Sequence, residues 1–470
     1  MKVEQIYTGC LAQGAYYIES EGEAAIIDPL READPYISRA EKDGSKIKYI
    51  FETHFHADFV SGHVELAEKT GAQIIYGPGA ETQYESYVAT DGEVLTLGKI
   101  KIKVLHTPGH TLESSCFLLI DENEKERALF SGDTLFIGDV GRPDLAIKSD
   151  LTKEDLAGML YDSLREKVMP LADDLIVYPA HGAGSACGKN LSSDTWDTLG
   201  HQKETNYALD EKKSKEQFVK EVTEGILPPP VYFAQNAMIN KMGTGSLDDV
   251  LKKGSVPLDV ETFEAIANHE GALVLDTRSK TEFAKAHIPN SIFIGIDGSF
   301  APWVGALIVD LKQPIIFVSD EGREEEVVIR LSRVGYDNTL GYLKGGIHAW
   351  KGSGKEVESI QTIEAIELAN RIKSGEPTNI LDVRKPGEFA SEHAVDAISL
   401  PLDFFNDEMK KLESETDYYI HCASGYRSII AASILKSRGY HKLVDVAGGY
   451  KAMSETDIPK TDYVCPSTLV

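Results

Sequence analysis

The chain has 470 residues, 42% of them hydrophobic, and carries 75 acidic against 48 basic side chains, a formal net charge of −27 at pH 7. This length is too great for one ordinary core, so we expect about two to four domains. A surface this acidic repels phosphate backbones, which argues against nucleic-acid binding. No run of about 18 apolar residues is present, which argues against a transmembrane helix and against membrane insertion.

The amino terminus and the cysteines bear on the cellular compartment. Glu4 comes early and no long apolar run follows it, so we expect no signal peptide. Five cysteines are scattered along the chain without a CxxC pair. Such a pattern is typical of reduced thiols in a reducing compartment. We therefore expect a cytoplasmic protein.

The first half of the chain alternates β-rich and helical segments. Strands are predicted where β-branched and aromatic residues cluster, at residues 24–28, 47–53, 72–76, 101–105, 115–120, 128–132 and 174–180. Helices are predicted where apolar residues recur at helical spacing, at residues 60–71, 153–168 and 215–225. We predict a first domain over residues 1–242. Residues 243–257, rich in Gly, Ser and charge, are predicted to be a linker.

The second half of the chain contains an internal repeat. Two pairs of segments match, the first at an offset of 106 positions (271–296 with 378–402) and the second at 104 (315–336 with 419–440). Each copy spans roughly a hundred residues, a usual size for a small α/β domain. We therefore predict two further domains, at residues 258–355 and 360–465.

Possible metal ligands follow several of the predicted strands. Residues 47–53 lead into His54, His56 and Asp58, and alternate side chains just past a strand can converge on one point. Three more ligand-type residues stand just past other predicted strands, namely His110, Asp133 and His181. Ligands of α/β sheets collect beyond the carboxyl ends of strands, so we expect a metal site there. A lone histidine is more often structural, but a complete set is not.

This pattern resembles the metallo-beta-lactamase superfamily, whose HxHxDH motif is followed by separate His, Asp and His ligands. The resemblance covers about residues 1–240 and implies an αββα sandwich. The last position of the motif is Phe59 in this chain. In two-metal members the histidine at that position helps to hold the second ion, so its absence favours one metal.

Within the superfamily, the segments THFHADFVSG, TPGHT, SGDTLFIGDVGRPDL and LPPPVYFAQNAMINKMG resemble persulfide dioxygenases and, less closely, glyoxalase II hydrolases. The resemblance implies one Fe(II) per chain, held by His54, His110 and Asp133, a set that suits O2 chemistry. It implies oxidation of a low-molecular-weight thiol persulfide, such as glutathione persulfide, by O2 and water to sulfite and the free thiol. It also implies a homo-oligomer.

The alternative is a zinc-dependent thioester hydrolase of glyoxalase II type with an appended sulfurtransferase. With iron, we expect His56, Asp58 and His181 to orient ligands or move protons; with zinc they could be ligands themselves. Arg142 and Asp144 match a GRxD element of the family. They form either a structural ion pair or, through Arg142, a contact with the carboxylates of the thiol carrier.

Two cysteines are candidates for sulfur chemistry, and Cys10, Cys116 and Cys465 are expected to be bystanders. Cys187 lies six residues after His181 and near Lys189, whose charge could lower the thiol pKa and give it an active role. The alternative for Cys187 is that of most buried cysteines, a small apolar side chain.

The second candidate, Cys422, begins the loop Cys422-Ala-Ser424-Gly425-Tyr426-Arg427 between a predicted strand and a predicted helix. Backbone N–H groups and the helix dipole can stabilise a thiolate there, and then a persulfide on the same sulfur. Arg427 offers a forked cation to sulfite or thiosulfate, and the three residues before it are expected to line the same site.

With LDVR before it and GGY after it, the loop resembles that of a rhodanese domain, which implies a sulfurtransferase. Phosphatases use a similar loop, but in this superfamily the six-residue spacing from Cys to Arg goes with sulfur transfer. In the first repeat the offset of 104 places Val318 at the cysteine position and keeps Arg323. That repeat resembles the inactive half of tandem rhodaneses, and we expect it to wall the active site, with Trp303 and Trp350 buried.

The predicted fold class is therefore α/β, an αββα sandwich followed by two α/β rhodanese domains. Sulfite from the iron site could accept the sulfur held on Cys422 to give thiosulfate, or Cys422 could make a persulfide from thiosulfate for the iron. Fusion holds both sites at high effective concentration, and the sequence leaves the direction open. A relay or scaffold without catalysis is disfavoured, because the ligand set is complete.

Overall fold

The computed structural model describes residues 1–145, 151–189 and 191–465. The chain divides into two compact units. The first comprises Met1–Leu247 with Ser332–Gly335, and the second comprises Asp248–Leu331 with Tyr336–Val470. The second unit therefore holds the second repeat and all of the first except Ser332–Gly335.

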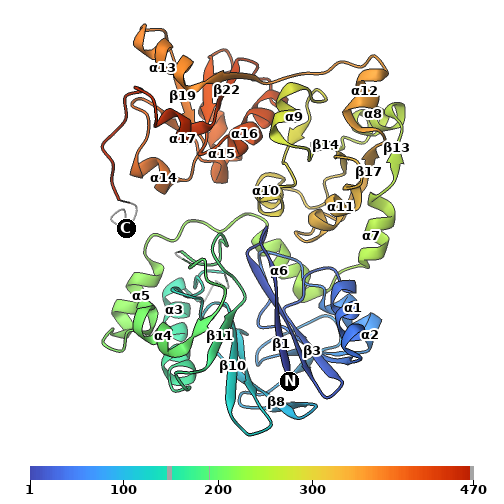
Figure 1. The fold of residues 1–470 in the computed structure, drawn as a ribbon, viewed down its shortest axis with the longest axis vertical. Coiled ribbons are helices and arrows are strands. Elements are labelled where there is room, and N and C mark those ends of the chain that lie inside the picture. The colour runs from blue at the N-terminus through green and yellow to red at the C-terminus, as the bar shows by residue number, and fades with distance from the viewer. Residues whose placement is uncertain (146–150, 190, 466–470) are drawn as a thin grey trace. The chain divides into compact units, whose positions relative to one another are not determined.

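The first unit contains two six-stranded sheets (Figure 1). One sheet has the order β1 (Lys2–Thr8), β2 (Gln13–Ser20), β3 (Glu23–Ile27), β4 (Lys46–Phe51), β5 (Gln73–Tyr76), β6 (Tyr87–Val88). The other has the order β12 (Asp197–Thr198), β11 (Ile176–Pro179), β10 (Glu126–Gly132), β9 (Ser115–Ile120), β8 (Ile100–His106), β7 (Val94–Leu97). Apolar side chains from both sheets meet in a shared core, which includes Phe51, Phe117 and Phe130.

Helices cover the outer face of each sheet, as Figure 1 shows. Apolar residues of α1 (Asp34–Asp43) and α2 (His63–Thr70) pack on the first sheet. Those of α3 (Lys153–Ser163), α4 (Leu199–Thr205) and α5 (Lys215–Thr223) pack on the second. α6 (Phe233–Met242) follows them. The predicted αββα sandwich is confirmed.

The second unit contains two five-stranded parallel sheets with the same strand order. The first is β13 (Pro257–Leu258), β17 (Thr339–Leu343), β16 (Ile315–Val318), β14 (Leu273–Asp276), β15 (Ile292–Phe293). The second is β18 (Gln361–Glu364), β22 (Leu443–Ala447), β21 (Tyr418–His421), β19 (Asn379–Asp382), β20 (Ile398–Ser399). The identical order shows that the sequence repeat is a structural repeat.

Each repeat also has its own set of helices. The first has α8 (Val260–His269), α9 (Lys280–Lys285), α10 (Phe300–Leu307), α11 (Glu324–Ser332) and α12 (Gly346–Gly352). The second has α13 (Ala365–Lys373), α14 (Pro386–Ser391), α15 (Phe405–Glu408), α16 (Tyr426–Ser437) and α17 (Gly449–Met453). Trp303 and Trp350 are buried in the first repeat, as expected.

A buried ion pair recurs at the end of one strand in each repeat. Arg278 lies 2.6 Å from Asp276, and Arg384 lies 2.6 Å from Asp382. Each guanidinium also donates to a backbone carbonyl further along, of Ala286 in one case and Glu392 in the other. Because a buried charge needs a partner, this shared motif explains why both copies keep Asp-x-Arg.

Within the predicted linker, residues 243–257, the structure forms the helix α7 (Leu247–Gly254). Its apolar Leu247 and Val250 are buried at helical spacing. Acidic residues begin the helix and Lys252 and Lys253 end it, which suits the helix dipole. The high content of Gly, Ser and charged residues in this segment therefore hid the helical spacing of its apolar residues.

Across the described residues, none of the helices has the length and apolar character needed to span a bilayer.

Candidate functional site

Three of the predicted ligands meet beyond the ends of their strands. His54 follows β4, His110 follows β8 and Asp133 follows β10, and all three side chains are buried. One ligand atom from each lies within 4.8 Å of the other two. The Asp133 Oδ2 atom is 3.3 Å from His110 Nε2 and 3.8 Å from His54 Nε2. This is a two-histidine, one-carboxylate set.

The hydrogen bonds around this set leave its ligand atoms ready for a metal. Thr53 Oγ1 donates its only proton to the Asp28 carboxylate at 2.9 Å, so His54 Nδ1, 3.0 Å away, must donate to Thr53. His110 Nδ1 donates to the Arg142 carbonyl oxygen at 2.9 Å. Both rings therefore carry their proton on Nδ1 and present the lone pair of Nε2.

The ligand atoms His110 Nε2 and Asp133 Oδ2 are buried, and among the described residues neither has a hydrogen-bond partner. Burial, with a contribution from neighbouring His56, also lowers the pKa of His54 well below its ordinary value, which keeps it neutral. Neutral imidazole and ionised carboxylate are the forms that bind metal. The donor set therefore fits a divalent transition metal.

His56 does not join this set, so of the three alternate positions 54, 56 and 58 only His54 contributes an atom to it. The Nε2 atom of His56 turns to two buried carboxylates, 3.1 Å from Asp28 and 3.5 Å from Glu52. Burial opposes protonation, but these carboxylates, Asp28 first, raise the pKa of His56 to about 9. A protonated imidazole has no lone pair for a metal, so packing against Asp28 and Glu52 removes His56 from the ligand set.

A second group of buried side chains adjoins the set. Ligand atoms of Asp58, His181 and Cys187 lie within 4.8 Å of one another. His181 Nδ1 donates to Asp133 Oδ1 at 2.8 Å, and its Nε2 is 2.8 Å from Asp58 Oδ2. Burial opposes protonation, yet Asp133 and Asp58 raise the pKa of His181 well above its usual value. His181 therefore ties this group to the carboxylate of the metal set.

The structure brings Cys187 into this group but does not activate it as the sequence suggested. Lys189 donates its Nζ protons to the backbone carbonyls of Glu221 and Glu224. Burial first, and then the charges of Asp58 and Asp133, raise the pKa of the Cys187 thiol well above its ordinary value. The expected lowering by Lys189 is wrong, because nearby carboxylates and burial outweigh an ammonium that is engaged elsewhere.

The loop of Cys422 lies between β21 and α16, as predicted. The Gly425 backbone N–H donates to Cys422 Sγ at 3.1 Å, and Gly425 takes a positive φ of 97° before the helix begins. The thiol is buried, whereas the aligned Val318 ends β16 with a side chain that offers no sulfur. An N–H bond and a helix amino end next to sulfur stabilise a thiolate or persulfide.

Arg427 was expected to bind an anion such as sulfite or thiosulfate. In the structure its guanidinium instead pairs with a carboxylate of its own repeat. Its two terminal nitrogens bond to the two oxygens of Glu388, at 2.6 and 2.9 Å. Burial works against the charge of Arg427, but Glu388 raises the pKa of the guanidinium above its usual value. Farther into the helix, Ser428 donates to the buried Asp445 at 2.6 Å.

Comparison with known proteins identifies the families of these domains. The model of the metallo-beta-lactamase superfamily matches residues 8–181, and that of the rhodanese-like domain matches 259–353 and 364–456. Hydroxyacylglutathione hydrolase GloC of Haemophilus influenzae is 30% identical over 217 residues, 41% of this chain and 97% of GloC. The chain belongs to the metallo-beta-lactamase superfamily. Two rhodanese-like domains follow its lactamase-type domain, so the predicted fusion is confirmed.

Solved structures of this superfamily are similar as well. A metallo-beta-lactamase from Staphylococcus aureus subsp. aureus COL is 33% identical, and the match covers 73% of this chain and 98% of that chain with a TM-score of 0.64. ETHE1 from Myxococcus xanthus is 26% identical, and the match covers 51% of this chain and 98% of that chain with a TM-score of 0.44.

In the lactamase-type domain, Arg142 forms the ion pair that was one of its two expected roles. Its guanidinium pairs with both oxygens of Asp144, at 2.6 and 2.7 Å. It also donates to the carbonyls of Ala186, at 3.2 Å, and Leu227, at 2.5 Å. With its donors engaged in this way, Arg142 holds three loop segments together, and the geometry favours the structural role.

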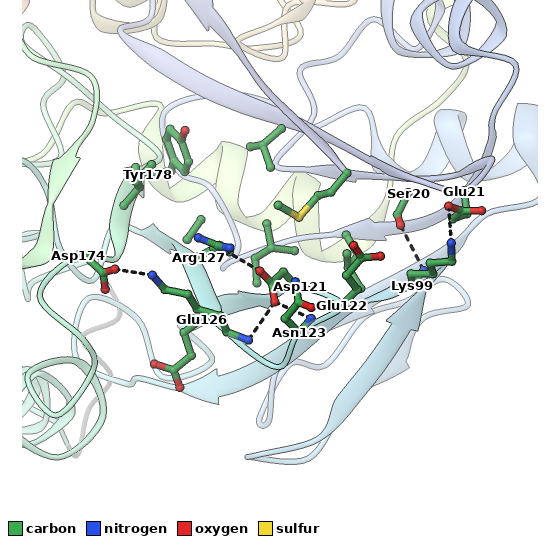
Figure 2. A pocket seen from close by; sticks show the side chains of 17 residues that line it. Ser20, Glu21, Lys99, Asp121, Glu122, Asn123, Glu126, Arg127, Asp174 and Tyr178 are labelled. Atoms are coloured by element: carbon green, nitrogen blue, oxygen red, sulfur yellow. Dashed lines mark hydrogen bonds and ion pairs between the residues drawn. The ribbon is translucent and has the colours of Figure 1, made fainter.

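A surface hollow of about 510 Å³ also lies in this domain, away from the metal set. Ion pairs lie along its wall, among them Lys99 with Glu21, labelled in Figure 2, and Lys125 with Asp174. Its lining comes from β1, from the turns after β2 and β9, and from the starts of β8, β10 and β11, so it lies at the ends of β8 and β10 opposite those that lead to His110 and Asp133. It contains no histidine or cysteine, and we assign it no chemistry.

Sequence reasoning missed several residues that shape the two sites, among them Asp28, Thr53, Glu52, Glu388 and Asp445. Asp28 stands at the end of a predicted strand, which is the position that had identified the other ligands. Glu52 and Thr53 directly precede His54 in the sequence. Glu388 and Asp445 had no local signal, because their partners are distant in the sequence. Glu388, for example, is 39 positions from Arg427.

Replacing Thr53 by Val should weaken metal binding, because His54 loses the acceptor that fixes its tautomer. We expect the apparent metal affinity, measured by competition with a chelator, to fall about 10- to 100-fold. The exposed Thr205→Val variant should bind as the wild type does. An unchanged affinity in Thr53→Val would contradict the hydrogen-bond chain from Asp28 to His54.

Burial raises the pKa of Asp445 to about 6, so the folded chain binds a proton there that the unfolded chain has lost. Its contribution to stability is complete below about pH 4 and is lost as pH rises through about 6, by about 3 kcal/mol. In Asp445→Asn this loss should be absent. Urea unfolding of both proteins at pH 4.5 and pH 7.5 measures the difference, and parallel changes in the two would refute the assignment.

Proposed function

We propose that the lactamase-type domain is an iron-dependent persulfide dioxygenase and that Cys422 carries sulfane sulfur as a rhodanese-type sulfurtransferase. The observation that carries this proposal is the separation of His54, His110 and Asp133 from His56, which two carboxylates hold. An isolated set of two histidines and one carboxylate suits non-haem Fe(II). A complete sulfur-carrier loop in the same chain supports sulfur chemistry at both sites.

The substrate in this proposal is a low-molecular-weight thiol persulfide such as glutathione persulfide. The persulfide, O2 and one water give the free thiol and sulfite. The sulfur–sulfur bond breaks, the outer sulfur is oxidised and O2 is reduced. His54, His110 and Asp133 would hold the Fe(II), which would supply the activation of O2 in this reaction.

The residues around the set keep its ligands in the binding form. The Asp28–Thr53 hydrogen bond holds the His54 proton on Nδ1, and the Arg142 carbonyl does the same for His110. His181 holds one oxygen of Asp133, which directs the other oxygen to the metal set. His181 also holds a proton between Asp133 and Asp58, at the edge of the site. Cys187 stays a neutral thiol beside it, and its raised pKa disfavours attack by its sulfur.

At the second site Cys422 holds sulfur as a persulfide, with the Gly425 N–H directed at Sγ. Sulfite attacks the outer sulfur, a new sulfur–sulfur bond forms and thiosulfate leaves. The bond to Cys422 breaks and its electron pair returns to Cys422 as the thiolate. The same step in reverse loads Cys422 from thiosulfate.

A second candidate is a thioester hydrolase with a zinc-bound hydroxide, since GloC of Haemophilus influenzae is called a hydroxyacylglutathione hydrolase. The buried position of Phe59 against His56 argues against a two-metal site, with ring centroids 4.4 Å apart. Thioester hydrolysis also has no step that uses the Cys422 loop.

Oxygen uptake by the purified full chain tests the first activity. With glutathione persulfide and one Fe(II) per chain, we expect O2 consumption to equal the sum of the sulfite and thiosulfate formed. Asp133→Asn should lower the rate more than about 100-fold, because the set loses its charged ligand. Zinc without iron, together with thioester hydrolysis and no oxygen uptake, would instead support the hydrolase.

Replacing Cys422 by Ser tests the coupling of the two sites. Given glutathione persulfide, the wild type should release a mixture of sulfite and thiosulfate, whereas Cys422→Ser should release sulfite at an unchanged rate of oxygen uptake. The exposed Cys465 provides a matched control as Cys465→Ser. An unchanged product mixture in Cys422→Ser would show that the loop takes no part.

A further inference from the structure

The first repeat lacks the catalytic cysteine but borders the loop that has one. Lys280 Nζ, at the start of α9, donates to the Ser424 carbonyl oxygen at 2.6 Å. The Tyr426 hydroxyl donates to the Gly295 carbonyl oxygen at 2.7 Å. Gly298 lies so close that a Cβ there would come within 2.2 Å of the Tyr426 ring. Two segments of the first repeat therefore wall the Cys422 loop, as expected from the sequence.

Lys280 also lies close to the next residue of the loop. Gly425 has a positive φ of 97°, and a Cβ at that position would stand 3.1 Å from Lys280 Nζ. Glycine therefore meets two demands, the left-handed backbone at the helix start and room for the ammonium. The same Gly425 donates its N–H to Cys422 Sγ, which places the lysine at the residue that contacts the sulfur.

Arg427, the cation of the Cys422 loop itself, is not free for an anionic substrate. Both oxygens of Glu388 bond to Arg427, and Asp445 is buried below the helix start. Lys280 differs, because within the described residues no carboxylate lies at ion-pair distance from its Nζ. An ammonium has three donors, and the Ser424 carbonyl takes one.

We propose that Lys280 is a substrate-binding residue of the Cys422 site, contributed by the repeat that lost its own cysteine. Its positive charge recruits the anionic sulfur donor or acceptor, the chemical class of sulfite and thiosulfate. This inference rests on the proposed sulfur transfer at Cys422. It gives the first repeat a chemical role: that repeat cannot carry sulfur, yet it supplies the charge that its partner repeat has neutralised.

The transfer step shows why such a charge is needed. Thiosulfate approaches the Cys422 thiolate, the sulfur–sulfur bond of thiosulfate breaks, and a sulfur–sulfur bond to Cys422 forms. Sulfite leaves with the electron pair of the broken bond. A dianion thus meets an anionic sulfur in a chain of net charge −27. A lysine at the loop lowers that repulsion both when thiosulfate approaches and while sulfite is still bound.

Paired alkylating reagents test the charge directly in the full-length chain. Iodoacetate and iodoacetamide have nearly the same size, but only iodoacetate is an anion. Their rates with Cys422 are followed by mass spectrometry of the peptide that contains it. We expect the iodoacetate-to-iodoacetamide ratio to fall about fivefold in Lys280→Ala and more than about tenfold in Lys280→Glu, while Lys280→Arg keeps most of it.

The matched control is Lys285→Ala, which removes an exposed lysine from the other end of α9. Its ratio should equal that of the wild type. A structural disturbance of the loop would change both reagent rates together and leave the ratio unaltered, so an unchanged ratio in Lys280→Ala and Lys280→Glu overturns the proposal.

Sulfur transfer from thiosulfate to cyanide gives the second measurement. Lys280→Ala should raise the KM for thiosulfate about fivefold with a smaller change in kcat, and added salt should raise the wild-type KM more than that of the variant. A wild type without any transfer would refute the proposed sulfurtransferase, while the alkylation ratios would still decide the role of Lys280. A KM unchanged in the variant would count against Lys280 alone.

Discussion

One carboxylate, Asp133, organises the lactamase-type domain. Its Oδ1 atom accepts a hydrogen bond from His181, and its Oδ2 atom faces His54 and His110. The parallel pairing of β10 with β11 brings Asp133 and His181 to neighbouring strand ends. One oxygen of Asp133 faces the metal set and the other bonds to His181. This single side chain therefore lies between the metal set and the group that contains Asp58 and Cys187.

The other buried charges of that domain prepare the ligands. Asp28 is at the centre of this arrangement, since it accepts from Thr53 and lies 3.1 Å from His56. Through Thr53 it holds the proton of His54 on the nitrogen remote from the metal set. Through its own charge it keeps His56 protonated and out of that set. Buried carboxylates need such partners, and here the partners also select which histidine can bind metal.

The second unit shows what a duplication can keep and what it can lose. Both repeats retain the sheet order and the buried pair of Asp276 with Arg278 or Asp382 with Arg384, because the fold depends on them. Only one retains the cysteine. Since Val318 packs as an apolar strand residue, the first repeat has a complete core without a cysteine at this position.

The αββα sandwich was implied by the resemblance to the metallo-beta-lactamase superfamily, whereas the sequence by itself determined the alternating strands and helices, the repeat, the residue types of the metal set and the loop of Cys422. These features follow from local periodicity and spacing, which the backbone translates directly into strands, helices and turns. Only the tertiary structure decided that His56 faces Asp28, that Glu388 occupies Arg427 and that Lys280 reaches Ser424, 144 positions away. Such partners are chosen by packing between distant segments, and a linear pattern carries no record of which buried charge will meet which.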